Sequence, residues 1–315
     1  MDLIGHYPRE VSGYPGSFSL LSNANEVDTA VVFVHGFWGD SQSTWQQFPF
    51  LIDFYANEHP WWDKADAHFY QYNGSGTTPI AVSADRFFGF LDGLFPRPNP
   101  AVFLQSSEGR GTQRGPDFRY KHLVLVGHSE GCVIIRRAIV TQYKLIRSSL
   151  AAGSRRLSRD YGLDQARRPS PGEEFLQNFP IFGSNVVLFA PAHLGASITG
   201  WRGVLLSLLR TRKVMGALVD SLTAYDELKK DSPVLKQLQA DTELFARQAN
   251  YCLAFVAQSY FGARDRIVYI GEYNTDPPAK LVENANHTSI CKPSALYREP
   301  LKYVYDGPVR RKSAP

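Results

Sequence analysis

Cysteine is scarce in this chain, which has three cysteines among 315 residues. An odd number of thiols set far apart in the sequence does not indicate a disulfide framework. Two of the three lie in apolar runs. We therefore expect buried thiols in a reducing compartment, and hence a cytoplasmic location.

Long apolar stretches are missing as well. No run of eighteen apolar residues occurs, so we expect no membrane-spanning helix. The start of the chain also lacks the basic region and apolar core of a signal peptide. Both absences favour a protein that is neither exported nor embedded in a membrane.

A strong charge of one sign and the common cofactor motifs are absent too. The formal net charge of +4 is too small to indicate a nucleic-acid partner. The sequence contains no H-E-x-x-H motif, no pair of C-x-x-C motifs and no phosphate-binding loop. We therefore expect neither a metal nor a nucleotide cofactor. These features leave the oligomeric state open.

What is present is the composition of an ordinary globular protein, 43% hydrophobic and 20% charged. Short apolar runs alternate with helical patterns, which is typical of a mostly parallel sheet covered by helices on both faces. We predict one α/β domain over residues 1–315. Strands are expected at 29–34, 67–72, 123–126, 185–190 and 251–259, and helices at 43–55, 80–94, 131–146 and 225–250, with a short helix from 293.

The chain is organised around the apolar run at 123–126, which Gly-His-Ser-Glu-Gly follows at 127–131. A helical pattern comes directly after it. Strand, tight turn and helix are the context in which G-x-S-x-G forms a nucleophile elbow. A side chain at Gly127 or Gly131 would strike the neighbouring strand or helix in so sharp a turn. The pattern predicts Ser129 as a catalytic nucleophile.

A second motif, His-Gly-Phe, follows the strand expected at 29–34. The backbone N–H of the residue after His-Gly can point into the space above Ser129. Together with the N–H of Glu130 it would form an oxyanion hole for a tetrahedral intermediate. We therefore predict Phe37 and Glu130 as the two donors.

A serine nucleophile needs a base within hydrogen-bond reach and a carboxylate that orients this base. The order nucleophile, acid, base of hydrolases with a G-x-S-x-G elbow is available as Ser129, Asp265 and His287. Asp265 follows an expected strand, at the sheet edge where loops gather. His193 is a rival base. Three other carboxylates could replace Asp265, namely Asp276, Glu283 and Glu243.

Two segments are expected to govern specificity. Residues 147–180 form a basic insertion loop, either solvated or a patch for anionic head groups. Residues 200–250 are a candidate helical lid or cap, in which 201–222 carries an apolar stripe interrupted by cations. A packed core helix is the competing interpretation. Transient contact with a membrane surface is consistent with the lid.

Four motifs together resemble those of α/β-hydrolases, in particular lipase-like members of the group that contains inositol-deacylase-like and serine-active-site-containing proteins. The motifs lie at 35–45, 127–131, 192–195 and 287–293, and the resemblance covers about residues 29–295.

This resemblance implies an α/β-hydrolase fold with a helical lid insertion, a triad on Ser129, Asp265 and His287, and esterase or lipase activity. The sequence departs from the family at Glu130 and Cys132, where a charged residue stands in the elbow and a thiol replaces a frequent glycine. The side chain of Glu130 is expected to point toward the site and to disfavour anionic acyl groups.

The leading hypothesis is a serine hydrolase that cleaves a carboxylic ester of a small molecule or a lipid. The same triad would serve an amidase, a peptidase or an acyltransferase. A non-catalytic interaction protein on the same scaffold is a third hypothesis, because a fold does not fix a function. The complete order of serine, aspartate and histidine argues against that third hypothesis.

Overall fold

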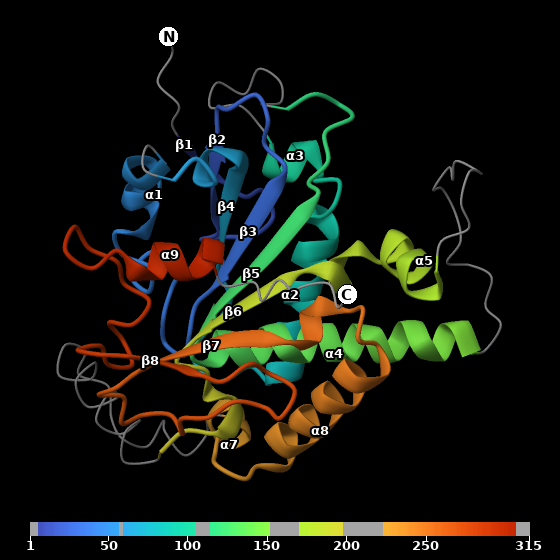
Figure 1. Ribbon diagram of the computed structural model, residues 1–315, viewed down its shortest axis with the longest axis vertical. Coiled ribbons are helices and arrows are strands. Elements are labelled where there is room, and N and C mark those ends of the chain that lie inside the picture. Colours follow the sequence, from blue (N-terminus) through green and yellow to red (C-terminus); the bar gives the residue numbers. More distant parts are fainter. Residues whose placement is uncertain (1–5, 57–58, 105–113, 152–169, 198–222, 307–315) are drawn as a thin grey trace, which may run out of the picture.

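The computed structural model describes residues 6–56, 59–104, 114–151, 170–197 and 223–306 (Figure 1). Its centre is an eight-stranded sheet with the strand order β1-β2-β4-β3-β5-β6-β7-β8. Strand β2 is antiparallel to both of its neighbours. The other strands of the sheet, β4, β3, β5, β6, β7 and β8 in this order, are each parallel to the next. The strands are β1 His6–Glu10, β2 Phe18–Ser22, β3 Thr29–Val34, β4 Ala65–Tyr70, β5 His122–His128, β6 Asn185–Phe189, β7 Ala257–Gly262 and β8 Lys280–Val282.

Helices cover both faces of this sheet. Helices α2, α4 and α8 pack together on one face, and α1 and α9 contact each other on the other face (Figure 1). The mostly parallel sheet with helices on both faces confirms the predicted α/β fold class, while the helical lid insertion remains a prediction. The α-helices are α1 Phe48–Ala56, α2 Ile80–Leu94, α3 Pro100–Phe103, α4 Glu130–Ala151, α5 Pro171–Asn178, α7 Thr223–Glu227, α8 Pro233–Gln248 and α9 Glu299–Asp306.

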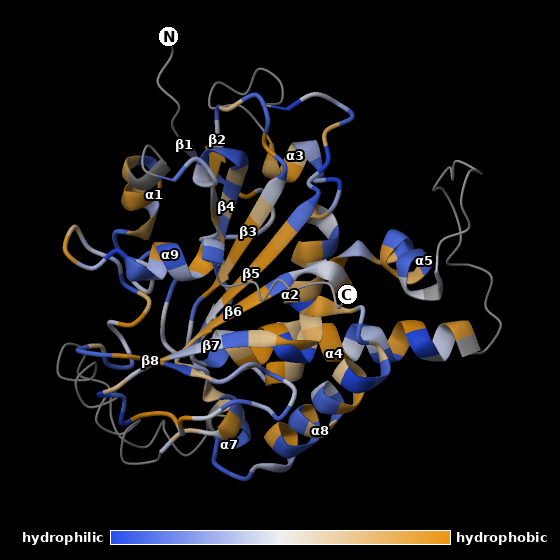
Figure 2. Ribbon diagram, in the orientation of Figure 1, coloured by the Kyte–Doolittle hydropathy of each residue, from blue (hydrophilic) through white to orange (hydrophobic). Residues whose placement is uncertain are grey.

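The central strands are buried on both faces, which explains their continuous apolar sequences. Every residue of β3 is buried, and its six residues are mostly β-branched or aromatic. Hydrophobic residues are accordingly concentrated on β3, β5 and β6, as Figure 2 shows. The predicted bounds of β3 and of α2 agree with the structure residue for residue.

Other predicted bounds are wrong by a few residues. Helix α9 begins six residues later than expected, because a tight turn between Ser294 and Tyr297 precedes it. Strand β7 begins only at Ala257, because residues 253–255 form a 3-10 turn. Strand β4 lies two residues earlier than expected.

The two segments expected to govern specificity are partly corrected. Within 147–180, α4 continues to Ala151 and α5 is a helix whose first turn is capped by Ser170, so these parts are not loop. Within 200–250, α8 is a packed helix that buries Leu235 and Leu238 and contacts α4. Residues 152–169 and the stripe at 201–222 lie outside the described residues.

The sequence analysis expected neither a membrane-spanning helix nor a disulfide. None of the described helices is long and apolar enough to cross a membrane. Cys132, Cys252 and Cys291 are all buried and form no disulfide. The reducing compartment remains a prediction.

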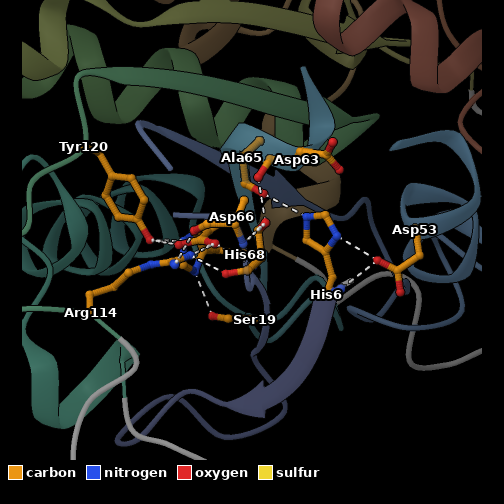
Figure 3. A network of polar contacts seen from close by, with 11 residues as sticks. His6, Ser19, Asp53, Asp63, Ala65, Asp66, His68, Arg114 and Tyr120 are labelled. Carbon is orange, nitrogen blue, oxygen red and sulfur yellow. Dashed lines mark hydrogen bonds and ion pairs between the residues drawn. The ribbon is translucent and has the colours of Figure 1, made fainter. Parts of the chain in front are cut away.

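A buried polar network ties the amino end of β4 to β2 and to the segment before β5 (Figure 3). Asp66 is fully buried at its centre. Its Oδ1 accepts hydrogen bonds from Ser22 N at 2.8 Å and from Arg114 Nη2 at 2.6 Å. Its Oδ2 accepts one from the hydroxyl of Tyr120 at 2.7 Å. The carboxylate therefore holds together segments that are far apart in the sequence.

Asp66→Ala should lower the free energy of unfolding by about 3–5 kcal/mol, because it removes the acceptor that three buried donors share. Urea unfolding at neutral pH measures this loss. The control is Glu26→Ala, which breaks the ion pair of Lys64 and Glu26 with side chains 52% and 85% exposed. An exposed pair contributes about 0–1 kcal/mol. Equal losses in the two variants would contradict a structural role for the network.

Candidate active site

Ser129 occupies a turn of a single residue. Strand β5 ends at His128 and helix α4 begins at Glu130. The backbone φ of Ser129 is 54°, in the left-handed region that residues with a side chain rarely adopt. A serine held in this strained position between strand and helix has the geometry of a nucleophile elbow.

Three glycines make this turn possible because the backbone segments around it approach closely. A Cβ at Gly131 would lie 2.3 Å from the carbonyl oxygen of His35, and one at Gly127 would lie 2.9 Å from Cys132 N. A Cβ at Gly36 would lie 2.8 Å from the Cβ of Ser129. The close approaches expected at Gly127 and Gly131, which leave no room for a Cβ, are thus present in the structure.

The structure brings Ser129, His287 and Asp265 into one chain of hydrogen bonds. His287 Nε2 lies 3.0 Å from Ser129 Oγ, and His287 Nδ1 lies 3.0 Å from Asp265 Oδ2. A carboxylate only accepts, so Nδ1 carries the proton and Nε2 is the acceptor for the serine hydroxyl. This tautomer is the one that a general base requires.

Asp265 is held as an ionised carboxylate by its turn. Its Oδ1 accepts from Ile267 N at 2.8 Å and from Val268 N at 3.3 Å. Burial opposes the charged form, but the hydrogen bond from His287 and these two N–H groups outweigh it and lower the pKa of Asp265. The carboxylate can therefore orient the imidazole and stabilise it when it gains a proton.

Two connected loops fix the positions of Asp265 and His287. The N–H of Asp265 bonds to the carbonyl of Gly262 at the end of β7, at 2.9 Å. The N–H of Arg264 bonds to the carbonyl of Ala285 at 3.0 Å and joins the two loops. Asn286 Oδ1 accepts from two backbone N–H groups just after His287, each at 3.0 Å.

His128 supports the base, a role that the sequence analysis did not assign. Its Nε2 lies 2.8 Å from the carbonyl oxygen of His287, so Nε2 carries a proton and donates it. Burial, together with the neighbouring His287, lowers the pKa of His128 to about 3. The ring is therefore neutral. The one sequence feature that pointed to a role for His128 was its position directly before Ser129 in the G-x-S-x-G motif.

Glu130 corrects an expectation, because its side chain is buried against Tyr72 and does not point into open space beside Ser129. It is 1% exposed, and its Oε2 accepts a hydrogen bond from the hydroxyl of Tyr72 at 2.9 Å. Burial raises its pKa to about 8, and nearby Glu227 adds to the rise. Buried against Tyr72 and mostly protonated near pH 7, it cannot repel an anionic acyl group in the way expected.

Tyr72 also braces the loop that carries Phe37. Its ring stacks on His35 with centroids 4.2 Å apart, and its hydroxyl lies 3.1 Å from the carbonyl oxygen of His35. Trp38 N donates to the carbonyl of Gly74 at 2.7 Å. The loop after β3 is therefore fixed beside the elbow. The roles of the Phe37 and Glu130 N–H groups in an oxyanion hole remain predictions.

A cavity of about 470 Å³ opens at the triad. This volume lies within the usual range for small-molecule sites. The lining combines rings, small polar groups and cations. Its residues are Gly36, Phe37, Trp38, Gly39, Ser43, Thr44, His128, Arg264, Arg266, Ile267, Asn286, His287, Thr288 and Lys292.

The rival residues are engaged elsewhere. His193 stacks on Tyr273 with centroids 4.5 Å apart, its Nε2 lies 3.0 Å from the carbonyl oxygen of Gly271, and burial lowers its pKa to about 3. Asp276 forms a buried ion pair with Arg136.

The other two rival carboxylates do not bond to His287 either. Glu243 accepts hydrogen bonds from Asn274, and Glu283 is exposed. Among the described residues, no group of three or more His, Cys, Asp or Glu could hold a metal.

Comparisons with known proteins gave matches in structure only. No family model and no curated protein matches the chain. A lipase of Bacillus licheniformis in its mature form is similar at 16% identity over 92% of this chain and 97% of its own, with a TM-score of 0.42. A carboxylesterase of Bacillus subtilis is similar at 10% identity over 96% and 91%, with a TM-score of 0.43.

A third similar structure is a phospholipase of Legionella pneumophila, at 13% identity and a TM-score of 0.44. The match covers 78% of this chain but 44% of that chain. At these identities the likeness concerns the fold alone and not the activity.

The buried acid beside the nucleophile makes a prediction about stability and pH. The pKa of Glu130 is raised from 4.5 to about 8 on folding, so the folded protein holds a proton that the unfolded chain releases. Stability from this proton is fully present below pH 4.5 and is lost as pH rises toward 8.

Glu130→Gln keeps the shape and stays neutral. Its free energy of unfolding, relative to wild type, should therefore increase between pH 5 and pH 8, by on the order of 1 kcal/mol per pH unit. Denaturant unfolding at a series of pH values measures the difference. Exposed Glu283→Gln is the control and should show a flat difference. A flat difference for Glu130→Gln as well would contradict the buried, protonated acid.

Proposed function

We propose that this protein is a serine hydrolase that cleaves a carboxylic ester through Ser129, His287 and Asp265. The observation that carries the proposal is the continuous chain of hydrogen bonds from Ser129 Oγ through His287 to Asp265, with both distances at 3.0 Å. The strained turn that presents Ser129 and the cavity above it support the same chemistry.

The first half of the reaction forms an acyl-enzyme. His287 Nε2 accepts the proton of Ser129 Oγ as this oxygen attacks the ester carbonyl. The N–H groups of Phe37 and Glu130 stabilise the resulting oxyanion. His287 then donates its proton to the alkoxy oxygen, so the C–O bond breaks and the alcohol leaves.

The second half regenerates the enzyme. Water loses a proton to His287 and attacks the acyl carbon, and the second tetrahedral intermediate collapses to release the carboxylic acid. The proton returns from His287 to Ser129 Oγ. Throughout, Asp265 stays ionised and stabilises the imidazolium that forms twice per cycle.

The cavity supports a small-molecule ester as the substrate class. The substrate that we propose includes a lipid or another hydrophobic acyl ester. The aromatic side chains of Phe37 and Trp38, which line the cavity and stack with centroids 5.9 Å apart, offer such an acyl group an apolar surface. The lid expected at 201–222 remains a prediction, since these residues lie outside the described part of the chain.

A fluorophosphonate probe tests the nucleophile. Wild-type protein should be labelled at Ser129, because the probe reacts with an activated serine hydroxyl, whereas Ser129→Ala should be neither labelled nor active on ethyl butyrate. Mass spectrometry locates the label, and the melting temperature shows that the variant folds. Absence of labelling in folded wild type would overturn the proposal.

The base and its carboxylate are tested by kinetics. His287→Ala should lower kcat by about 10³-fold or more, and Asp265→Asn somewhat less, because residues of a triad act as a unit. His193→Asn is the matched control and should retain activity in correctly folded protein. An active His287→Ala enzyme together with an inactive His193→Asn enzyme would show that the base was wrongly assigned.

A further inference from the structure

The cavity at the triad has an unbalanced charge. Three of its lining side chains are cationic, Arg264, Arg266 and Lys292. None of the described residues that line it carries a carboxylate. A concave site lined by charge of one sign attracts ligands of the opposite sign.

These three cations are not neutralised by ion pairs within the described chain. No Asp or Glu in the described ranges forms a salt bridge with any of them. Arg264 Nη2 donates to the amide oxygen of Asn284 at 3.1 Å, which leaves its charge uncompensated.

The two carboxylates nearest in sequence to the lining use their oxygens as acceptors for other groups and form no salt bridge with these three cations. Asp265 accepts from His287 and from the turn that it closes. Asp40 accepts from the hydroxyl and N–H of Ser43 and from Gln42 N, at 2.6–2.8 Å. Burial of Glu130 against Tyr72 removes a further acidic side chain from the cavity.

The loops that carry Asp265 and His287 also position the backbone of these three cationic residues. Arg264 and Arg266 flank Asp265 on its turn, and the N–H of Lys292 bonds to the carbonyl of Ser289 in the loop of His287, at 3.0 Å. The three cations therefore line the same cavity as His287. The rings of Phe37 and Trp38 supply the apolar part of the lining.

We propose that the substrate is an ester that carries a carboxylate or a phosphate near the scissile bond, with Arg264, Arg266 and Lys292 as the residues that select it. This inference rests on the proposed ester hydrolysis. The anion is bound by charge and by donors that match carboxylate and phosphate oxygens. The uncharged part of the substrate contacts Phe37 and Trp38.

Matched pairs of esters test the selection. In each pair a terminal methyl group is replaced by a carboxylate: ethyl pentanoate against monoethyl glutarate for the acyl side, and propyl butyrate against the butyryl ester of 3-hydroxypropionate for the alcohol side. Initial rates are followed in a pH-stat with monomeric substrate. We expect kcat/KM to be about tenfold higher for the charged member of at least one pair, since exposed charge pairs each contribute modestly and three act together.

Ionic strength provides a test that needs no variant. Raising the salt concentration from 0.02 M to 0.5 M should shrink the preference for the charged ester while leaving the neutral ester nearly unaffected, because salt screens exposed charges. A preference that does not change with salt would overturn the assignment to these cations.

Variants assign the effect to residues. In Arg266→Gln with Lys292→Gln, the ratio of kcat/KM between charged and neutral ester should fall several-fold toward one. Lys236→Gln on α8, whose ammonium pairs with Asp231 outside the cavity, is the control and should keep the wild-type ratio. The ratio within one preparation is insensitive to partial misfolding, because unfolded protein loses both activities.

The outcomes separate the two proposals. Labelling of Ser129 and hydrolysis of neutral esters, with no preference for charged ones, would overturn the anion selection and leave ester hydrolysis standing. Failure to label and to cleave any ester would overturn the hydrolase itself. Faster hydrolysis of a neutral, membrane-bound ester on anionic than on neutral vesicles, with no preference between the soluble esters, would assign the cations to a membrane surface and overturn their role in substrate selection.

Discussion

The turn of one residue at Ser129 is the constraint on which the site depends. A strand and a helix that meet at a single residue force its φ to 54° and bring the elbow against the end of β3. The contact is so close that Gly131 and Gly36 have no room for a Cβ. Because these backbones touch, the loop that carries Phe37 lies beside Ser129, and the side chain of Tyr72 braces it there.

Burial removes charge from most of the groups around this turn. The pKa of His35 is lowered to about 4 and that of His128 to about 3, while that of Glu130 is raised to about 8, in each case mainly by desolvation. All three are therefore largely uncharged near pH 7. Asp265 is the exception, because hydrogen bonds to its charged form outweigh burial. The ionised carboxylate thus acts on His287 with little competition from these neighbours.

Much of this arrangement could be predicted from the sequence, because it depends on backbone chemistry. The apolar run of β3 and the glycines of the elbow report local requirements that a short motif can carry. The prediction of Ser129, Asp265 and His287 rests on the order usual in hydrolases with a G-x-S-x-G elbow. The sheet class followed from the alternation of such runs.

Features that depend on long-range packing could not be predicted in the same way. The orientation of Glu130 is decided by Tyr72, which is 58 residues away in sequence. The hydrogen bond from His128 to the carbonyl of His287 joins residues 159 apart. Helix α8 lies inside the segment 200–250 that was expected to form a lid or cap, and its packing on α4 joins residues far apart in the sequence.

The residues proposed for catalysis and those proposed for substrate selection are held by the same loops. The N–H of Arg264 joins the loop of Asp265 to the loop of His287, while its guanidinium lines the cavity. A change in backbone position would therefore disturb the triad and the cations together. A change in side-chain charge at Arg266 or Lys292 leaves the loop hydrogen bonds in place, because these involve backbone groups and the side chains of Asp265 and Asn286. The proposed substrate preference can thus change by substitution at Arg266 or Lys292 while the geometry of Ser129, His287 and Asp265 is retained.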